Sequence, residues 1–124
     1  MPRVVELLGA PADVRQARDP AEQARWLLRV SGAELISITR GERGSLLCSR
    51  DGSDEHKGLA IQVQDTVGAG DAFTAALVYH HLRRASLETM NEAANRMGAW
   101  VASNAGATPE PEVAILERVR SPLD

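Results

Sequence analysis

Apolar residues recur at helical spacing near the start of the chain, and this pattern predicts two helices. Residues 4–8 are expected to be the end of a short helix that stops at Gly9. A longer helix is expected to begin after Asp19, which can cap the free amides of the first turn, and to end at Gly32. Residues 12–19, between the two helices, are polar and carry no periodic pattern. The inward-facing positions of the longer helix are Ala24, Trp26, Leu27 and Leu28.

Three short runs of β-forming residues follow and predict a small sheet. These runs are residues 35–39, 45–49 and 59–63. Residues 40–44 are expected to form a turn, Asp51–Gly52 is typical of a hairpin tip, and residues 53–58 are expected to be a polar loop. Cys48 lies inside the second run with no histidine nearby, which predicts a buried, unreactive thiol.

The rest of the chain predicts three helices, and the whole order predicts an α/β protein with helices covering a sheet. An alanine-rich helix opens at residues 68–71, Ser86 can cap the next helix, and the last covers residues 110–119. His80 and His81 are expected to be polar residues at a helix C-terminus, where the helix dipole favours them. Adjacent histidines point to different faces of a helix, so this pair does not predict a metal site.

Composition narrows the class of protein. The 124 residues have room for a single domain, 1–124, and 44% of them are hydrophobic while 25% are charged. A net charge of -3 argues against a nucleic-acid binder with a broad basic surface. One cysteine excludes an internal disulfide and a cysteine-cluster zinc site. With no apolar run near the ~20 residues of a membrane span and no signal-peptide core, we expect a cytoplasmic protein without membrane or nucleic-acid partners.

Candidate chemistry is concentrated in residues 65–73, Asp-Thr-Val-Gly-Ala-Gly-Asp-Ala-Phe. Gly68, Ala69 and Gly70 lie where a strand is expected to give way to a helix, so backbone amides there can approach a bound anion. Asp71, beside such a site, could accept a proton from a hydroxyl that attacks a phosphate. The spacing is neither a Walker A loop nor a G-x-G-x-x-G fingerprint. The residues alone also fit a purely structural glycine turn in which Asp71 is an ordinary capping acid.

The same nine residues resemble the C-terminal signature of the ribokinase-like (PfkB) family of carbohydrate and nucleoside kinases. Residues 39–44 resemble the T-x-G-x-x-G turn of that family, and residues 105–109 resemble its closing loop. Residues 94–100 are most similar to bacterial fructokinase-like members. The resemblance covers essentially the whole chain. It implies the C-terminal portion of a three-layer α/β/α fold, with a mostly parallel sheet flanked by helices.

The resemblance also implies roles for particular residues. Asp71 would be the catalytic base, and the backbone amides of Gly68, Ala69, Gly70 and Asp71 would form the anion hole for the transferred phosphoryl group. The cofactor would be ATP with Mg²⁺, and many relatives also bind K⁺. The ATP site would include Thr39, Gly41, Gly44 and Asn95. The K⁺ ligands would be the Asp65 carboxylate and carbonyls near Val67, Val101, Asn104 and Gly106.

Members of the family are more than twice as long, and this chain resembles only their C-terminal part. We therefore expect the N-terminal sugar-binding and lid portion to be absent. The expected function is ATP-dependent phosphoryl transfer to a sugar hydroxyl, fructokinase-like, by a chain that is inactive alone. The alternative is a non-catalytic nucleotide-binding or structural remnant that pairs with another chain. A free sheet edge would allow such pairing, including with a second copy.

Overall fold

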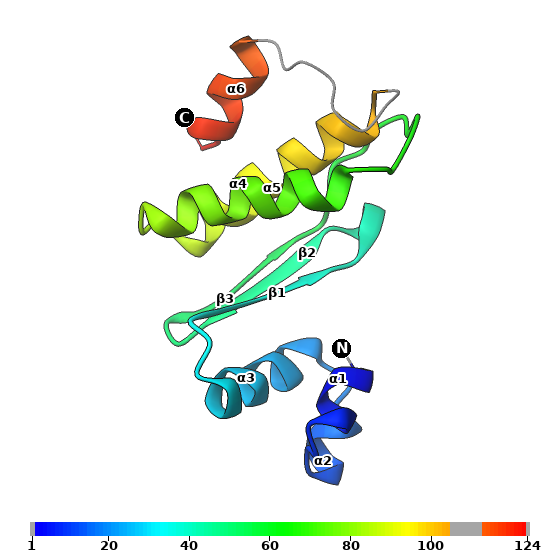
Figure 1. The fold of residues 1–124 in the computed structure, drawn as a ribbon, viewed down its shortest axis with the longest axis vertical. Helices are drawn as coiled ribbons and strands as arrows, with labels where there is room; N and C mark the ends of the chain where they lie inside the picture. The colour runs from blue at the N-terminus through cyan, green and yellow to red at the C-terminus, as the bar shows by residue number, and fades with distance from the viewer. Residues whose placement is uncertain (1, 105–112, 124) are drawn as a thin grey trace.

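A small sheet lies between two sets of helices in the computed structural model, which describes residues 2–104 and 113–123. Helices α1–α3 lie on one side of the sheet, α4 and α5 cover the other, and α6 lies outside them (Figure 1). The helices are α1 (Pro2–Leu7), α2 (Ala12–Arg15), α3 (Pro20–Ser31), α4 (Ala69–Leu82), α5 (Leu87–Ala102) and α6 (Val113–Arg120). The strands are β1 (Leu35–Thr39), β2 (Ser45–Ser49) and β3 (Gly52–His56), and a 3-10 turn, η1, covers Gly41–Arg43.

The described strands form one antiparallel sheet in the order β1-β2-β3. Leu35 is paired with Ser49 across β1 and β2, and Ser45 with His56 across β2 and β3. The mostly parallel sheet implied by the family resemblance is therefore wrong for the described residues. The connections explain why, because a parallel pairing needs a crossover of a dozen or more residues and these strands are joined by short turns.

The third strand lies earlier in the chain than the sequence pattern predicts. Residues 53–56, part of the predicted polar loop 53–58, form β3 together with Gly52 of the predicted hairpin tip, and the predicted strand at residues 59–63 is wrong. The tight turn after Ser49 brings residues 52–56 directly beside β2, whose register then selects them. Residues 59–63 have no strand neighbour in the described structure, and their apolar side chains Leu59, Ile61 and Val63 are exposed.

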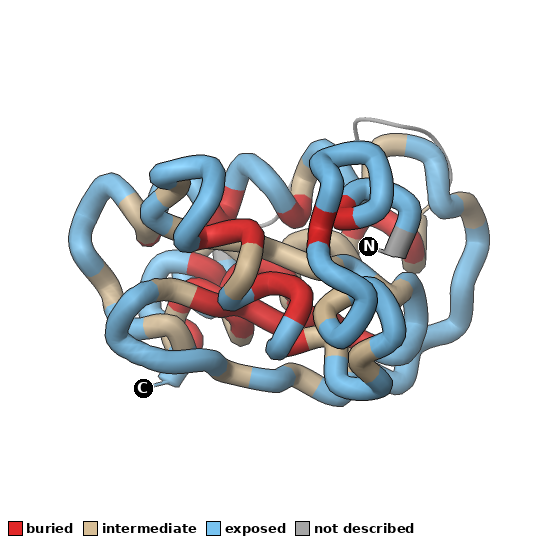
Figure 2. Tube along the Cα trace, turned by 90° about the horizontal axis from the view of Figure 1, so that it is seen from below, coloured by how far each residue is buried: buried red, intermediate tan, exposed pale blue. Residues whose placement is uncertain are grey.

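The central strand β2 is buried on both faces and joins two parts of the core. Leu46 and Cys48 pack with α3, whereas Leu47, on the other face, packs with α4 and α5. Alternate residues of a strand point to opposite faces, so this one run holds both helical layers. Figure 2 shows the buried segments running through the middle of the molecule. The predicted burial of the Cys48 thiol is confirmed.

The helix ends follow the predicted capping residues. The Asp19 carboxylate accepts a hydrogen bond from the Ala21 amide at 2.9 Å, and α3 ends at Gly32 with φ +71°. The Ser86 hydroxyl accepts from the Thr89 amide at 3.1 Å at the start of α5. The single-turn helix α2 was not predicted, since its residues are polar and lack a periodic pattern. No helix within the described ranges is long and apolar enough to cross a membrane.

The two histidines of α4 have different surroundings. His80 is buried, and its Nε2 forms a 2.6 Å hydrogen bond with the Val119 carbonyl of α6. His81 is partly exposed and pairs with Glu34 at 3.2 Å. The predicted difference in face is confirmed, and both histidines lie in the last turn of α4 as predicted, but the burial of His80 was not predicted. Its ring is buried because α6 packs over this side of α4, which the local sequence does not reveal.

Candidate functional site

A glycine turn opens α4, as the sequence predicts. Gly68 has φ +83°, a conformation that glycine adopts without the steric cost of a side chain. Its carbonyl accepts the first helical hydrogen bond, from the Ala72 amide at 3.0 Å. The Ala69 amide donates to the Thr66 carbonyl at 3.2 Å. Of the four amides expected in an anion hole, that of Ala69 therefore already has an internal acceptor.

The remaining amides of this turn face open space. Among the described residues, the amides of Gly68, Gly70 and Asp71 have no hydrogen-bond acceptor. A methyl group added at Gly70 would meet no other atom within 4 Å. Asp71 is exposed, and its carboxylate makes no hydrogen bond within the described ranges. Together these groups place unpaired donors and one carboxylate at the positive end of α4.

Close packing against α5 holds the first turn of α4 in place. A Cβ at Gly98 would lie 3.3 Å from the Ala69 carbonyl oxygen and 3.5 Å from the Phe73 Cβ. Glycine at this position therefore lets α5 approach the turn that carries the free amides. Sequence reasoning did not single out Gly98, although a glycine on the inward side of an alanine-rich helix is a usable signal for close helix packing.

The residues before α4 are tied to the end of α5. The amides of Gln64 and Asp65 both donate to the Ala102 carbonyl, at 2.8 and 3.2 Å. The Asp65 carboxylate in turn accepts from the Val67 amide at 3.0 Å. These bonds bring the 64–67 loop beside the C-terminal turn of α5.

Four of the five residues expected to bind K⁺ thus lie at one end of the molecule. Asp65 and Val67 are in the loop, while Val101 and Asn104 are at the end of α5. The Asn104 amide donates to the Val101 carbonyl at 3.2 Å. Gly106, the fifth, lies outside the described residues. No group of three or more His, Cys, Asp or Glu side chains suited to a metal occurs among the residues that the structure describes.

The turn after β1 contains two glycines with different surroundings. Gly41 is exposed, and a methyl group added there would meet nothing within 4 Å. Gly44 is buried, and a methyl group added there would overlap the His56 carbonyl oxygen and the Gly58 amide nitrogen. Thr39, the other residue expected at the nucleotide, is exposed at the end of β1. Gly44 is thus needed for backbone packing, whereas Thr39 and Gly41 face solvent.

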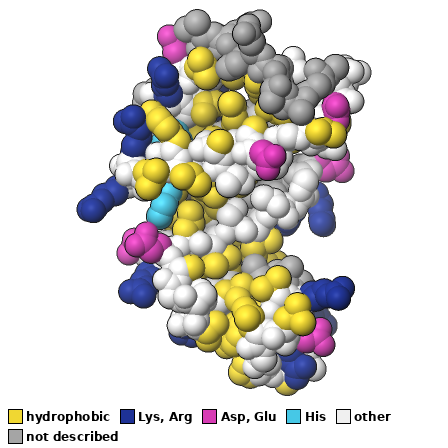
Figure 3. Space-filling model, viewed as in Figure 1, with side chains coloured by type: hydrophobic (Ala, Val, Ile, Leu, Met, Phe, Trp, Pro, Cys, Tyr) yellow, Lys and Arg dark blue, Asp and Glu magenta, His cyan; other side chains and the backbone are white. Residues whose placement is uncertain are grey.

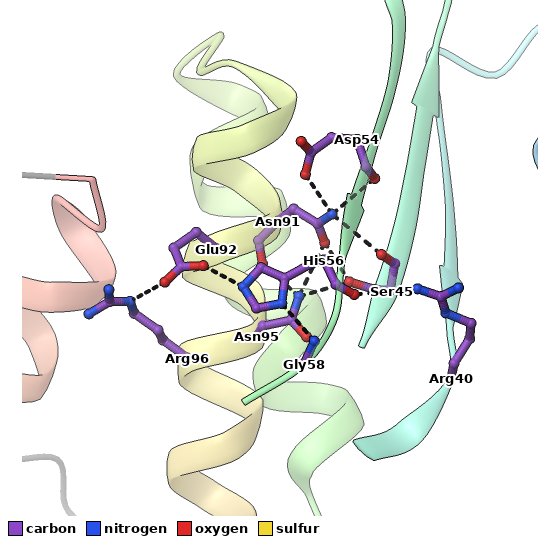
Figure 4. A network of polar contacts seen from close by, with 9 residues as sticks. All are labelled: Arg40, Ser45, Asp54, His56, Gly58, Asn91, Glu92, Asn95 and Arg96. Carbon is purple, nitrogen blue, oxygen red and sulfur yellow. Dashed lines mark hydrogen bonds and ion pairs between the residues drawn. The ribbon is translucent and has the colours of Figure 1, made fainter. Parts of the chain in front are cut away.

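Asn95 belongs to a buried polar network and does not face an open cleft (Figure 4). Its side-chain amide donates to the Ser45 hydroxyl and to the Asn91 carbonyl, both at 2.8 Å. The Asn91 side chain, completely buried, donates to the carbonyl and carboxylate of Asp54 at 3.0 and 2.8 Å. The network joins α5 to β2 and β3. Two asparagines four residues apart among buried alanines are the sequence signal that could have predicted it.

Beside this network, His56 connects β3 to α5 (Figure 4). The Gly58 amide donates to His56 Nδ1 at 2.9 Å, so Nε2 carries the ring proton and donates to Glu92. Arg96 donates to the other oxygen of Glu92 at 2.8 Å. Burial alone would raise the pKa of Glu92, but the hydrogen bonds from Arg96 and His56 outweigh it and lower the pKa. None of these three side chains was predicted from the sequence.

A shallow cavity of about 410 Å³ lies between residues 59–61, α5 and α6. None of the described residues that were predicted to take part in the site lines this cavity. Its lining is mostly apolar with two arginines: Leu59, Ala60, Ile61, Arg96, Ala99, Trp100, Ser103, Ile115, Arg118 and Val119.

Comparison with known proteins finds a matching family model, similar sequences and similar structures. Residues 5–113 match the family model described as pfkB family carbohydrate kinase. The bifunctional protein HldE of Koribacter versatilis is 33% identical over 93% of this chain, and fructokinase-2 of rice (Oryza sativa subsp. japonica) is 32% identical over 73%. The structure of Escherichia coli phosphofructokinase-2 in complex with potassium covers 95% of the chain with a TM-score of 0.76 and 20% identity, a likeness of fold.

The chain spans only part of each relative. It covers 24% of HldE, 29% of the rice fructokinase and 38% of the phosphofructokinase chain. Because relatives with different names match at nearly equal identity, the comparisons do not single out one member of the family.

Proposed function

Because this chain belongs to the pfkB family of carbohydrate kinases, we propose that it carries the phosphoryl-transfer part of an ATP-dependent sugar kinase, with a fructose-like acceptor. The observation that carries the proposal is the open start of α4. There the amides of Gly68, Gly70 and Asp71 have no acceptor among the described residues, and Asp71 is exposed. A phosphoryl group needs converging donors, and an acceptor hydroxyl needs a nearby base.

In the proposed reaction, Asp71 accepts the proton of a sugar hydroxyl. The hydroxyl oxygen forms a bond to the γ-phosphorus of ATP, the bond to the bridging oxygen breaks, and ADP leaves with that electron pair. The free amides at the start of α4 hold the charge that develops on the transferred group. The Ala69 amide, which bonds to Thr66, would shape the turn and leave binding to its neighbours.

The described residues also leave room for a phosphate and for K⁺ at this site. An added methyl at Gly70 would meet nothing within 4 Å, so a phosphate can approach the backbone there. Bound Mg²⁺ and K⁺ would neutralise phosphate charge. Asp65 and Val67 lie in the loop that is bonded to the end of α5, where Val101 and Asn104 lie, and these four residues would hold K⁺ with Gly106. Thr39 and Gly41 are open for ATP, while Gly44 and Asn95 would support its site from inside the protein.

The test is a coupled assay of ADP release with fructose and other sugars, comparing the wild type with Asp71→Asn. Where the wild-type chain releases ADP in a sugar-dependent reaction, we expect that release to fall by about 10²–10⁴-fold in the variant, because the base is lost, while ATP binding is retained. Release that does not depend on sugar, or that is unchanged in Asp71→Asn, would contradict the proposed role of Asp71.

A second candidate function is a module that binds nucleotide phosphates without transferring them and pairs with another chain. Two observations favour it. The chain spans about a quarter of the HldE relative, and β1 has a neighbour on only one side among the described strands. Binding of ATP by calorimetry without sugar-dependent ADP release would support this candidate over the first. Absence of ATP binding would contradict both.

A further inference from the structure

A polar groove, separate from the apolar cavity described above, lies on the α3 side of the sheet, between α3 and the turn that joins β2 to β3. Its volume is about 460 Å³. Three of its five lining residues are arginines: Arg25, Leu28, Arg29, Ser49 and Arg50. The helices α4 and α5, which carry the proposed phosphoryl-transfer site, cover the opposite face of the sheet (Figure 1). The groove therefore shares no residue with that site.

The arginines of this groove form a concentrated positive charge. Arg25 and Arg29 are four residues apart, so they lie on the same side of α3, where like charges repel each other. Arg50 adds a third positive charge from the β2–β3 turn. Within the described ranges, none of the three forms an ion pair, although Asp19, Glu22 and Asp51 belong to the same segments. In a chain with net charge -3, the three guanidinium groups are thus without a directly paired carboxylate among the described residues.

The rest of the groove suits a small anion. Arg25 of α3 lines the groove together with Ser49, the last residue of β2, so the groove runs between the helix and the end of that strand. The Ser49 hydroxyl oxygen accepts from the Asp51 amide at 3.2 Å, so its own proton remains to donate. Leu28 supplies the apolar side of the groove.

We propose that this groove binds a small phosphorylated anion with two phosphate groups, one held by Arg25 and Arg29 and the other by Arg50 and Ser49. A guanidinium presents a planar set of donors that matches a phosphate in two places at once, which a lone ammonium cannot do. Two positive groups on opposite walls favour two separate phosphates over one. Binding here does not depend on Asp71 or on the start of α4.

The test titrates the 124-residue chain with inorganic pyrophosphate and follows the arginine Nε–Hε signals by NMR, with affinity measured by calorimetry. We expect the signals of Arg25, Arg29 and Arg50 to shift together. The affinity should weaken by at least about tenfold in Arg25→Gln/Arg29→Gln, because two charge-assisted contacts are lost. Arg84→Gln, at an exposed arginine after α4 that does not line the groove, is the matched control and should bind as the wild type does.

Titrations with two further ligands identify the source of the phosphates. Orthophosphate should bind more weakly than pyrophosphate, and a hexose bisphosphate that binds more tightly than both would assign the groove to a sugar ester. No shift of the three arginine signals would overturn the proposal, as would equal weakening in Arg84→Gln. Gly70→Ala, which alters only the start of α4, should leave these shifts intact, so failure of the groove and failure of the proposed function are distinguishable.

Discussion

At the scale of single residues, Glu92 links several parts of the structure through its two carboxylate oxygens. One accepts from His56 on the edge strand β3 and the other from Arg96 on the next turn of α5. His56 in turn accepts from the Gly58 amide. The ionised carboxylate thus fixes β3, α5 and the start of the segment that leads to α4.

This arrangement predicts how stability depends on pH. The folded pKa of Glu92 is lowered from its ordinary value of 4.5. The stability that the ionised carboxylate adds to the fold is therefore fully present above that value and is lost as pH falls through the folded pKa. In urea titrations, we expect the free energy of unfolding of Glu92→Gln to fall less between pH 7 and pH 3 than that of the wild type. Glu88→Gln, an exposed acid on the same helix, is the control and should follow the wild type. Identical pH profiles for all three proteins would contradict the role of Glu92.

At the scale of elements, the turn after β1 packs its backbone directly on the segment after β3. An added methyl at Gly58 would lie 2.9 Å from the Gly44 amide nitrogen, and one at Gly44 would overlap the backbone of residues 56–58. Two glycines therefore face each other where η1 meets the end of β3. This contact sets the position of Thr39 and Gly41, which the proposed nucleotide site needs.

Gly41 and Gly44, both in the turn after β1, provide a matched pair of substitutions. Gly41→Ala places a methyl in open space and should cost only the strain of φ +60°, about 1–2 kcal/mol. Gly44→Ala combines φ +85° with overlap of backbone atoms and should cost about 3 kcal/mol or more. Urea unfolding of both variants checks this order. Equal losses of stability in the two variants would mean that Gly44 does not pack on the backbone of residues 56–58 as described.

Sequence patterns predicted the elements whose signals are local. The Asp19 and Ser86 caps, the Gly32 stop and the glycine turn at Gly68 are set by neighbouring residues, and all are confirmed. The strand at residues 59–63 was wrong because an alternating apolar run becomes a strand only beside a partner. His80 and Asn95 were placed incompletely because their surroundings come from elements distant in sequence, α6 for His80 and β2 for Asn95.

At the scale of the whole molecule, the elements gather the proposed site at one end. Figure 1 shows the start of α4, the end of α5 and the turn after β1 at the same end of the molecule. Elsewhere several large apolar side chains are exposed. Figure 3 shows hydrophobic side chains gathered over the α1–α3 layer, where Leu7 is 77% exposed. Such a surface, with the free edge of β1, suits contact with further protein.

The central claim is that the backbone at the start of α4 binds the phosphates of ATP, and Gly70→Ala tests it most directly. The methyl group has room in the folded protein, since at Gly70 it would meet nothing within 4 Å, so the variant should fold as the wild type does. The Cβ of a helical residue points toward the helix N-terminus, into the space proposed for phosphate. Calorimetric titration with MgATP should therefore give an affinity at least about tenfold lower than that of the wild type. A stable Gly70→Ala protein that binds ATP as tightly as the wild type would contradict the account.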